Sequence, residues 1–173
     1  MQTDELELIA QSLRHDADAY GQLVERYKNA LYRHCFALVR DEATAEDIAQ
    51  ETFITAYYKL TQFDTSRRFS TWLFKIATNK ALTHLKRTKV TLPLDTELVS
   101  SVVSASESLE RQAEFAELHT AVAQLQPKYR AVISLYYWQG LPYEEIAIAL
   151  DVPVGTVKGW MNRAKSQLRK ELI

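Results

Sequence analysis

The basic residues of this chain gather in two short blocks that contain no Asp or Glu. Residues 67–89 hold seven Lys or Arg, and residues 156–170 hold five, so the two blocks contain 12 of the 21 basic residues. The formal net charge of the whole chain is nevertheless −1. Such segregated positive charge is typical of a protein that neutralises phosphates locally, so the two blocks indicate nucleic-acid binding.

Aromatic residues alternate with cations in and just before the first block. The rings belong to Phe63, Phe69, Trp72 and Phe74, and the cations among them are Arg67, Arg68, Lys75 and Lys80. Cations that hold phosphates beside rings that stack on unpaired bases are typical of a single-strand site. The alternative is that Trp72 and its neighbours Leu73, Ile76 and Ala77 are core, which we expect for those four. Asn79 also lies in this block, and its amide can both donate to and accept from a base edge; a solvated Asn is the alternative.

A second kind of surface is predicted where acidic residues cluster, in residues 41–51. Here an apolar stripe recurs every four residues, at Ile48, Thr52, Ala56 and Leu60, and predicts the buried face of a helix. Another face of the same helix carries Asp47, Gln50, Glu51 and Ile54. A solvated acidic face is the alternative interpretation. The apolar neighbour at Ile54 favours a contact with another protein.

The second basic block follows the pattern of a helix-turn-helix. Pro127 suits the first turn of a helix, and Gly140 suits its end. A short helix, "YEEIAIAL", is followed by the turn "DVPVG" and by a last helix that begins near Val154. Val157, Met161, Ala164 and Leu168 form one face of that last helix, and Lys158, Asn162, Lys165 and Arg169 form the opposite one. The second helix of this motif lies in the DNA major groove, so we expect the basic face of the last helix to contact DNA. A basic face that is only solvated is the weaker alternative.

Helices are needed to position these surfaces, and the amino-acid composition is typical of a mostly helical protein. The chain of 173 residues has only four Gly and four Pro and is 47% apolar, and no β-branched run alternates with polar residues. We predict an all-α protein with two small helical domains, residues 1–90 and 113–173, the second ending in the helix-turn-helix. Residues 91–112 include "TLPLDTELVSSVVSASES", which is rich in Ser and Thr and has no helical face, so we predict a flexible acidic linker there.

Other classes of protein fit the residues less well. The four histidines have no metal-ligand spacing, and no nucleophile triad or Gly-rich phosphate loop is present, so we expect no cofactor, no metal and no enzymatic activity. A nuclease using Glu46, Asp47 and Glu51 would lack a converging ligand from elsewhere. A helix-turn-helix regulator acting alone would leave the acidic stripe unexplained. The N-terminus is acidic and amphipathic, no membrane span is present, and Cys35 is expected to be a small buried hydrophobe, so we place the protein in the cytoplasm.

Two long segments resemble one known family. "LQPKYRAVISLYYWQGLPYEEIAIALDVPVGTVKGWMNRAK" resembles the promoter −35 reading domain of bacterial sigma factors, and "DIAQETFITAYYKLTQFDTSRRFSTWLFKIATNKALTHLKR" resembles their −10 melting domain. With only a short linker between them, the arrangement is similar to the extracytoplasmic-function (ECF, group IV) class. The resemblance implies a protein that binds core RNA polymerase, recognises both promoter elements and melts the −10 DNA to transcribe a stress or envelope regulon.

The resemblance also implies roles for individual residues. The residues expected to contact the β′ clamp helices are Asp47, Gln50, Glu51, Phe53 and Ile54. Contact with the −10 strand falls to Phe63, Arg67, Arg68, Ser70, Lys75, Asn79, Lys80, His84, Lys86 and Arg87, with residues 63–71 forming a pocket for a flipped base that Asn79 captures. Contact with the −35 duplex falls to Gly155, Thr156, Lys158, Gly159, Asn162, Arg163 and Lys165. Residues 129–139 would meet the β flap, the linker would run towards the RNA exit path, and an anti-sigma factor is the further expected partner.

Three positions depart from the family pattern. Gly159 and Trp160 stand where Ser-Arg is common, and Pro142 replaces a frequent Ser. Gly159 lowers helix propensity by about 1 kcal/mol relative to Ala and permits a closer backbone approach. Trp160 is expected to pack rather than to read bases, because Trp is highly buried on average. These changes affect the −35 sequence that is read, not the function.

Overall fold

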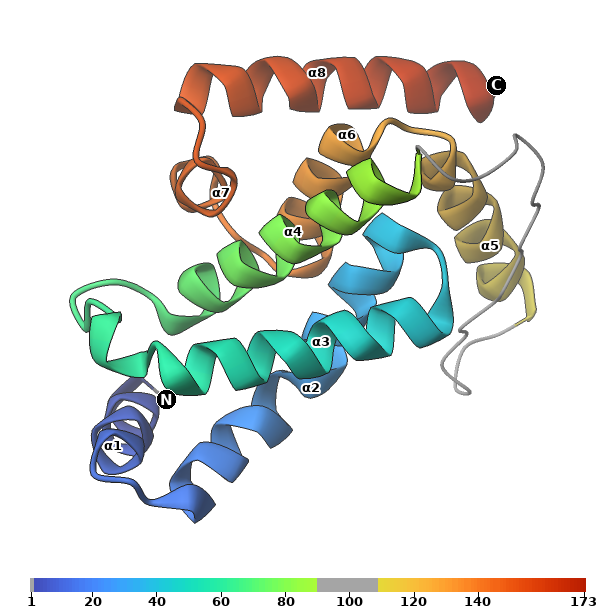
Figure 1. Ribbon diagram of the computed structural model, residues 1–173. Coiled ribbons are helices and arrows are strands. Elements are labelled where there is room, and N and C mark those ends of the chain that lie inside the picture. Colours follow the sequence, from blue (N-terminus) through green and yellow to red (C-terminus); the bar gives the residue numbers. More distant parts are fainter. Residues whose placement is uncertain (1, 90–108) are drawn as a thin grey trace.

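The computed structural model describes residues 2–89 and 109–173, and all regular elements in these two ranges are helical. The prediction of an all-α fold is confirmed (Figure 1). In chain order the elements are α1 (Gln2–Leu13), α2 (Ala17–Val39), α3 (Glu42–Tyr58), the 3-10 turn η1 (Leu60–Gln62), α4 (Phe69–Thr88), α5 (Leu109–Ala123), α6 (Pro127–Ile133), the π-helical turn η2 (Ser134–Trp138), α7 (Tyr143–Leu150) and α8 (Val154–Glu171).

Helices α1 to α4 form the first domain, and local capping sets where α2 and α3 begin. Asp16 accepts hydrogen bonds from the amides of Asp18 and Ala19, at 3.0 and 3.1 Å. Asp41 accepts from the amide of Thr44 at 2.9 Å. Such caps satisfy amides that have no partner within the helix. The apolar stripe predicted for α3 is buried along its whole length, as expected, so α3 turns its acidic face outward.

Helices α6 to α8 form the second domain around the predicted helix-turn-helix. Helix α6 begins at Pro127 and α8 at Val154, both as predicted. Gly140 has a φ of 68° after the π-helical turn, and Asp151 has a φ of 55° in the turn before α8. Most of the predicted linker lies outside the described residues, but its last positions, 109–112, belong to α5. The helical part therefore begins earlier than the Ser-rich composition indicated.

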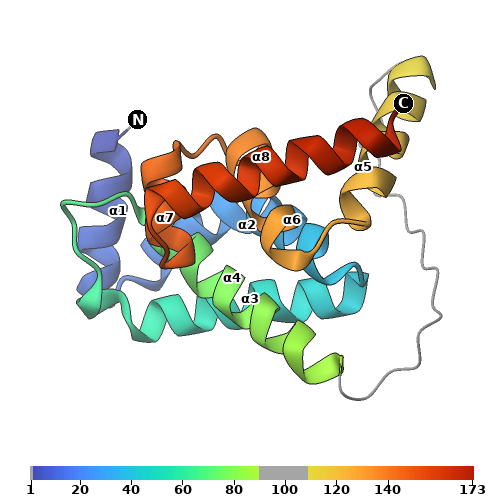
Figure 2. The same cartoon turned by 90° about the horizontal axis from the view of Figure 1, so that it is seen from above.

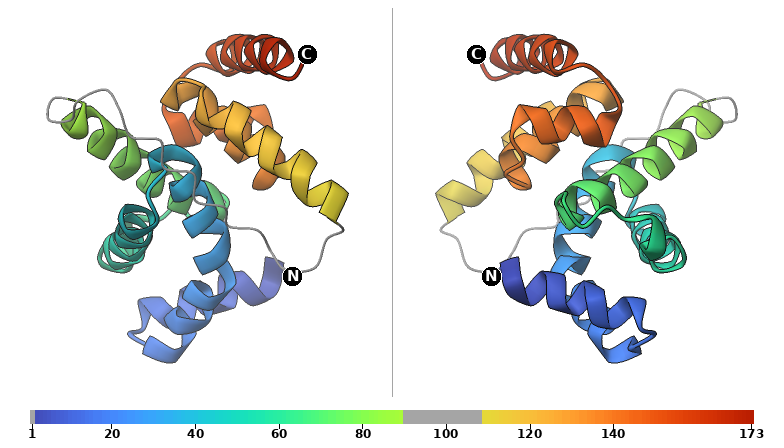
Figure 3. Two further views of the ribbon diagram at one scale, coloured as in Figure 1. Left: turned by 90° about the vertical axis from the view of Figure 1, so that its right-hand side faces the viewer. Right: turned by 90° about the vertical axis from the view of Figure 1, so that its left-hand side faces the viewer.

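The two domains pack directly on each other. Helix α7 lies across α4, and α6 with η2 lies against α2, while α8 forms the outer edge of the molecule (Figures 1 and 2). Figure 3 shows α5 projecting from the other side of the second domain. Between the described residues, hydrogen bonds that cross this junction join Thr71 Oγ1 to Glu145 Oε2 (2.6 Å), His34 Nδ1 with Ser134 Oγ (2.8 Å), Arg130 to the Leu38 carbonyl (2.6 Å) and Gln139 to the Ala30 carbonyl (3.2 Å).

A buried histidine lies at the centre of the junction. Besides Ser134, the ring of His34 contacts Thr78 Oγ1 through Nε2 at 2.7 Å and meets the edge of the Phe74 ring, with centroids 5.3 Å apart. His34 is fully buried, and burial lowers its pKa to about 3. The imidazole is therefore neutral at physiological pH, and the two hydroxyls satisfy both of its nitrogens.

We expect His34 to make the junction sensitive to acid. Its pKa in the folded protein lies below the ordinary value of 6.5, so the unfolded chain takes up the proton first. The stability contributed by the neutral ring is therefore complete above that ordinary value and declines as the pH falls towards the folded value. The slope is at most about 1.4 kcal/mol per pH unit, which gives a loss of about 2 kcal/mol between pH 7 and pH 5.

Urea unfolding of the wild type and of His34→Gln at these two pH values measures this loss. The variant should lack about 2 kcal/mol of the wild-type decline. His15→Gln, at an exposed histidine, is the matched control and should keep the full decline. Identical declines for wild type and His34→Gln would contradict the prediction.

No helix within the described ranges is long and apolar enough to cross a lipid bilayer. In the same residues, no group of His, Cys, Asp or Glu side chains is arranged to hold a metal ion.

Candidate nucleic-acid interface

The loop before α4, residues 64–68, forms a short arch, and the residues on either side of it are buried. Phe63 is 8% exposed and Phe69 is 2% exposed, while residues 64–68 between them are exposed. Within the arch, Asp64 Oδ1 accepts from the amide of Ser66 at 3.0 Å and from its hydroxyl at 2.7 Å. This Asx turn gives the arch a defined shape and presents Arg67 and its neighbour Arg68 to solvent.

The rings of this segment pack against one another. Phe63 lies 5.6 Å from Phe69 and 5.2 Å from Trp72, measured between ring centroids, and Phe74 is buried. The predicted stacking of bases on Phe63 is therefore not available in this conformation, because the ring already fills the core beneath the arch. Burial of large rings is favourable by itself, so a sequence pattern of aromatics and cations cannot distinguish a stacking platform from an anchored loop.

Asn79 is exposed on α4, in a groove between α3 and α4 of about 510 Å³. The groove is lined from α4 by Asn79, Lys80, Thr83, His84 and Arg87, and from α3 by Thr44, Asp47, Ile48 and Glu51. Lys80 Nζ lies 3.8 Å from Glu51 Oε2 across it, a solvent-accessible pair that contributes little stability. The structure thus brings the predicted −10 residues of α4 next to the acidic stripe of α3.

The arch does not contribute to this groove. Ten residues separate Phe69 from Asn79, which at 1.5 Å per residue places them roughly 15 Å apart along α4. None of residues 63–71 is among the residues that line the groove around Asn79. The two features would contact different positions of a bound strand.

The other predicted −10 residues divide into two groups. Lys86 and Arg87 are exposed in the last turn of α4, where the helix dipole favours cations. Lys75 and Ser70 are half-buried. Lys75 and Arg67 line a second groove, of about 560 Å³, whose other wall belongs to α7 and the turn before α8. In this conformation the second domain therefore flanks the N-terminal half of α4.

The acidic stripe on α3 is exposed as expected, and it is longer than predicted. Asp47, Gln50 and Glu51 are exposed, Ile54 is 57% exposed and Phe53 is half-buried. Tyr58, which the sequence analysis did not include, is 78% exposed. It follows Ile54 by four residues, the spacing of one helical turn, so the same periodicity could have identified it.

Helix α8 separates its two faces clearly. Val157, Met161 and Ala164 are fully buried. Of the predicted −35 residues, Gly155, Lys158, Asn162 and Arg163 are exposed, and Thr156, Gly159 and Lys165 are half-buried. A Cβ at Gly159 would meet nothing within 4 Å, so packing inside this chain does not require glycine there. The half-buried Trp160 packs against the core with Lys128 Nζ 5.6 Å from its ring centroid, as its predicted packing role requires.

The segment predicted to meet the β flap is largely buried, between α8 of its own domain and α2 of the first domain. Residues 129–135 are buried, and three members of the segment, Arg130, Ser134 and Gln139, form the bonds to α2 described above. Tyr136 and Tyr137 remain 38% and 55% exposed. A partner that bound the whole segment would have to displace α2.

An exposed basic helix beside an acidic one, followed by a helix-turn-helix domain, defines a two-part DNA-binding protein. Comparison with known families agrees: residues 23–91 match Sigma-70 region 2, and residues 115–168 match Sigma-70, region 4. The chain is 38% identical to the ECF RNA polymerase sigma factor SigW of Bacillus subtilis (strain 168), over 95% of this chain and 94% of that protein. It is 30% identical to the RNA polymerase sigma-H factor of Pseudomonas aeruginosa, over 99% and 95% of the two chains.

Solved structures show the same fold. The structure of CnrH in complex with the cytosolic domain of CnrY superposes with a TM-score of 0.74 at 29% identity, covering 98% of this chain and 96% of that one. The chain belongs to the ECF RNA polymerase sigma factors, which confirms the predicted resemblance. It is a non-catalytic subunit that initiates transcription with RNA polymerase and binds DNA through the helix-turn-helix of region 4.

Proposed function

We propose that this sigma factor reads the −35 duplex with α8, holds the −10 single strand along α4 and its preceding arch, and transcribes a stress or envelope regulon from the cytoplasm. The observation that carries the proposal is the separation of its charged surfaces. Cations are exposed on α8 of the second domain and on α4 of the first, and the acidic stripe of α3 adjoins the cations of α4. One chain thus offers two DNA surfaces and one surface for a different kind of partner.

The acidic stripe is proposed to dock on the β′ clamp helices of core polymerase. Asp47, Gln50 and Glu51 offer acceptors for a basic or polar helix, and the exposed side chain of Ile54 supplies an apolar centre. Charge complementarity speeds encounter, and the apolar residue contributes most where water is excluded. Residues 129–139 are proposed to meet the β flap once the second domain has moved away from α2.

Docking on the polymerase would turn two weak DNA contacts into a strong one. Each basic surface alone neutralises few phosphates, and affinity grows with the number neutralised. When the polymerase holds both domains at a fixed spacing, the second contact becomes intramolecular. A base captured outside the stack then offsets the few kcal/mol of unstacking, so melting follows from binding.

An anti-sigma factor is a further proposed partner. The solved relative CnrH is bound by the cytosolic domain of CnrY. A partner of that kind could hold this chain in the packed arrangement, in which α7 flanks α4 and the α6 segment faces α2.

Run-off transcription with purified chain, core polymerase and a promoter library tests the proposed function. Transcripts that appear only when the chain is added, and that start downstream of shared −35 and −10 sequences, are the expected result. Transcripts that do not depend on the chain would overturn the proposal. Specific duplex binding by the chain without polymerase, and no effect on transcription, would instead indicate an ordinary helix-turn-helix regulator.

A further inference from the structure

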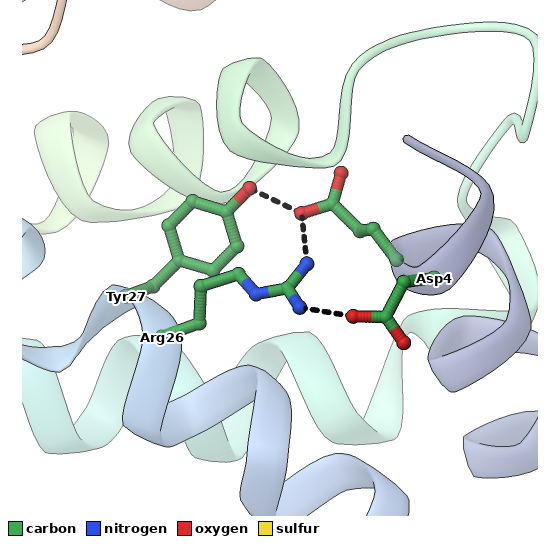
Figure 4. Close-up of polar contacts among 4 residues, drawn as sticks. Asp4, Arg26 and Tyr27 are labelled. Carbon is green, nitrogen blue, oxygen red and sulfur yellow. Dashed lines mark hydrogen bonds and ion pairs between the residues drawn. The ribbon is translucent and has the colours of Figure 1, made fainter. Parts of the chain in front are cut away.

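Two adjacent residues of α2 bind α1 through a compact polar cluster. Arg26 Nη2 lies 2.7 Å from Asp4 Oδ2, and Arg26 Nη1 lies 3.9 Å from Glu5 Oε1 (Figure 4). The Tyr27 hydroxyl donates a short hydrogen bond to the same Glu5 oxygen. Glu5 therefore interacts with a cation and a phenol at once, and its side chain is only 18% exposed.

The opposite side of Tyr27 faces the start of α4. Its ring lies 5.6 Å from the ring of Phe69, the buried residue that ends the arch. Tyr27 is thus the link between α1 and the point where the arch joins α4.

We propose that Tyr27 is a positioning residue for the arch, residues 64–68, and that α1 holds Tyr27 in place through Glu5. The proposal rests on the proposed function, because it assumes that the arch contacts the −10 strand. Helix α1 lies before the residues that match Sigma-70 region 2, which start at residue 23.

The geometry favours this role over simple packing. The arch itself is exposed, so its position is set by its two buried ends, Phe63 and Phe69. The ring of Phe69 contacts Phe63, Trp72 and Tyr27, and Tyr27 is the member that belongs to another helix. A shift of Tyr27 would therefore move the end of the arch and, with it, the guanidinium groups of Arg67 and Arg68.

The phenol of Tyr27 acts as a hydrogen-bond donor to Glu5. Burial is the main cause that raises the pKa of Tyr27 well above its ordinary range, followed by the hydrogen bond to Glu5, so the phenol keeps its proton. It can then donate to Glu5 Oε1, the same oxygen that faces Arg26 Nη1.

The experiment measures strand recognition by holoenzyme assembled from core polymerase and each variant. A fluorescent single-stranded oligonucleotide pool of random sequence is the probe, and sequencing of the bound fraction gives the base preference at each position. We expect Tyr27→Phe and Glu5→Ala each to reduce the base preference about fivefold at the strand positions that the arch contacts. Fivefold is about the factor that corresponds to the loss of one ordinary hydrogen bond. The positions whose preference depends on Asn79 should be unchanged, and so should binding of a −35 duplex pool.

Two further variants separate positioning from general stability. Glu5→Gln keeps an acceptor for the phenol and should retain most of the preference, and the double variant Tyr27→Phe with Glu5→Ala should lose no more than either single one. Tyr20→Phe is the matched control. It removes another α2 hydroxyl, which donates to the Phe53 carbonyl at 2.5 Å, and it should leave the strand preference unchanged.

These outcomes distinguish the positioning role of Tyr27 from the proposed −10 function on which it rests. If Asn79→Ala reduces the preference while Tyr27→Phe and Glu5→Ala do not, the positioning role is wrong and the proposed function stands. Equal losses on the strand pool and the −35 duplex pool, or an equal loss for Tyr20→Phe, would also overturn the positioning role. If the wild-type holoenzyme shows no base preference at all, the proposed −10 function itself is wrong.

Discussion

Replacing Asn79 by alanine is expected to slow promoter opening by roughly 10- to 100-fold, because a well-placed amide contributes about 1–3 kcal/mol of base recognition. Asn79 is exposed on α4, and its amide opens into the groove shared with α3. The cations Lys80 and Arg87 line the same groove and can hold the phosphates on either side of a captured base. Stopped-flow fluorescence of a base analogue placed in the −10 strand measures the opening rate of holoenzyme complexes.

The same variant should leave −35 duplex binding unchanged, because α8 lies on the outer edge of the second domain and makes no contribution to the groove. Thr83→Ala is the matched control: Thr83 is also exposed, lies on the same helix and lines the same groove, but has no amide. It should open promoters at close to the wild-type rate. Equal losses of opening and of −35 binding for Asn79→Ala would show that the side chain acts on the fold and not on a base.

Replacing Arg130 by alanine is expected to lower the free energy of unfolding by about 3 kcal/mol, since it leaves two buried carbonyls without a donor. Arg130 is 8% exposed and donates to the carbonyls of Leu125 and Leu38, each at 2.6 Å. Burial, followed by the nearby charge of Arg40, lowers its pKa to about 10, so the guanidinium stays charged at pH 7. The bond to Leu38 crosses to α2, and the bond to Leu125 lies within the second domain.

Urea unfolding at neutral pH, followed by circular dichroism, measures this loss. Because one of the two bonds joins the domains, we also expect the variant to unfold in two resolved steps where the wild type unfolds in one. Lys128→Ala is the control on the same helix: it removes cation–π contacts to Tyr129 and Trp160 and should cost about 1 kcal/mol or less. A loss for Arg130→Ala no larger than that of the control would contradict the prediction.

The junction also bears on how the free protein differs from the polymerase-bound one. If the second domain moves away from α2 on the polymerase, the bonds from Arg130, Ser134 and Gln139 must be exchanged for others. Breaking each of these hydrogen bonds costs about 1 kcal/mol net, and more where a buried partner is left unpaired. Part of the energy of core binding would therefore be used to separate the domains.

The sequence by itself determined the local features of this protein. Pro127 and Val154 start their helices as predicted, and the buried faces of α3 and α8 follow the four-residue spacing of their apolar side chains. The exposed acidic stripe, including Ile54, follows from the same periodicity. These features depend on neighbours within one or two helical turns, so a single helix contains the information that sets them.

Only the tertiary structure decided which surfaces meet. His34 and Ser134 are 100 positions apart, and nothing in the spacing of either residue indicates that they share a hydrogen bond. The same holds for Phe63, whose ring packs under the arch although its neighbours indicated a stacking site, and for Asn79, which opens into a groove with α3. The physical reason is that packing between helices depends on the shape and polarity of two complete surfaces, whereas periodicity describes one surface at a time.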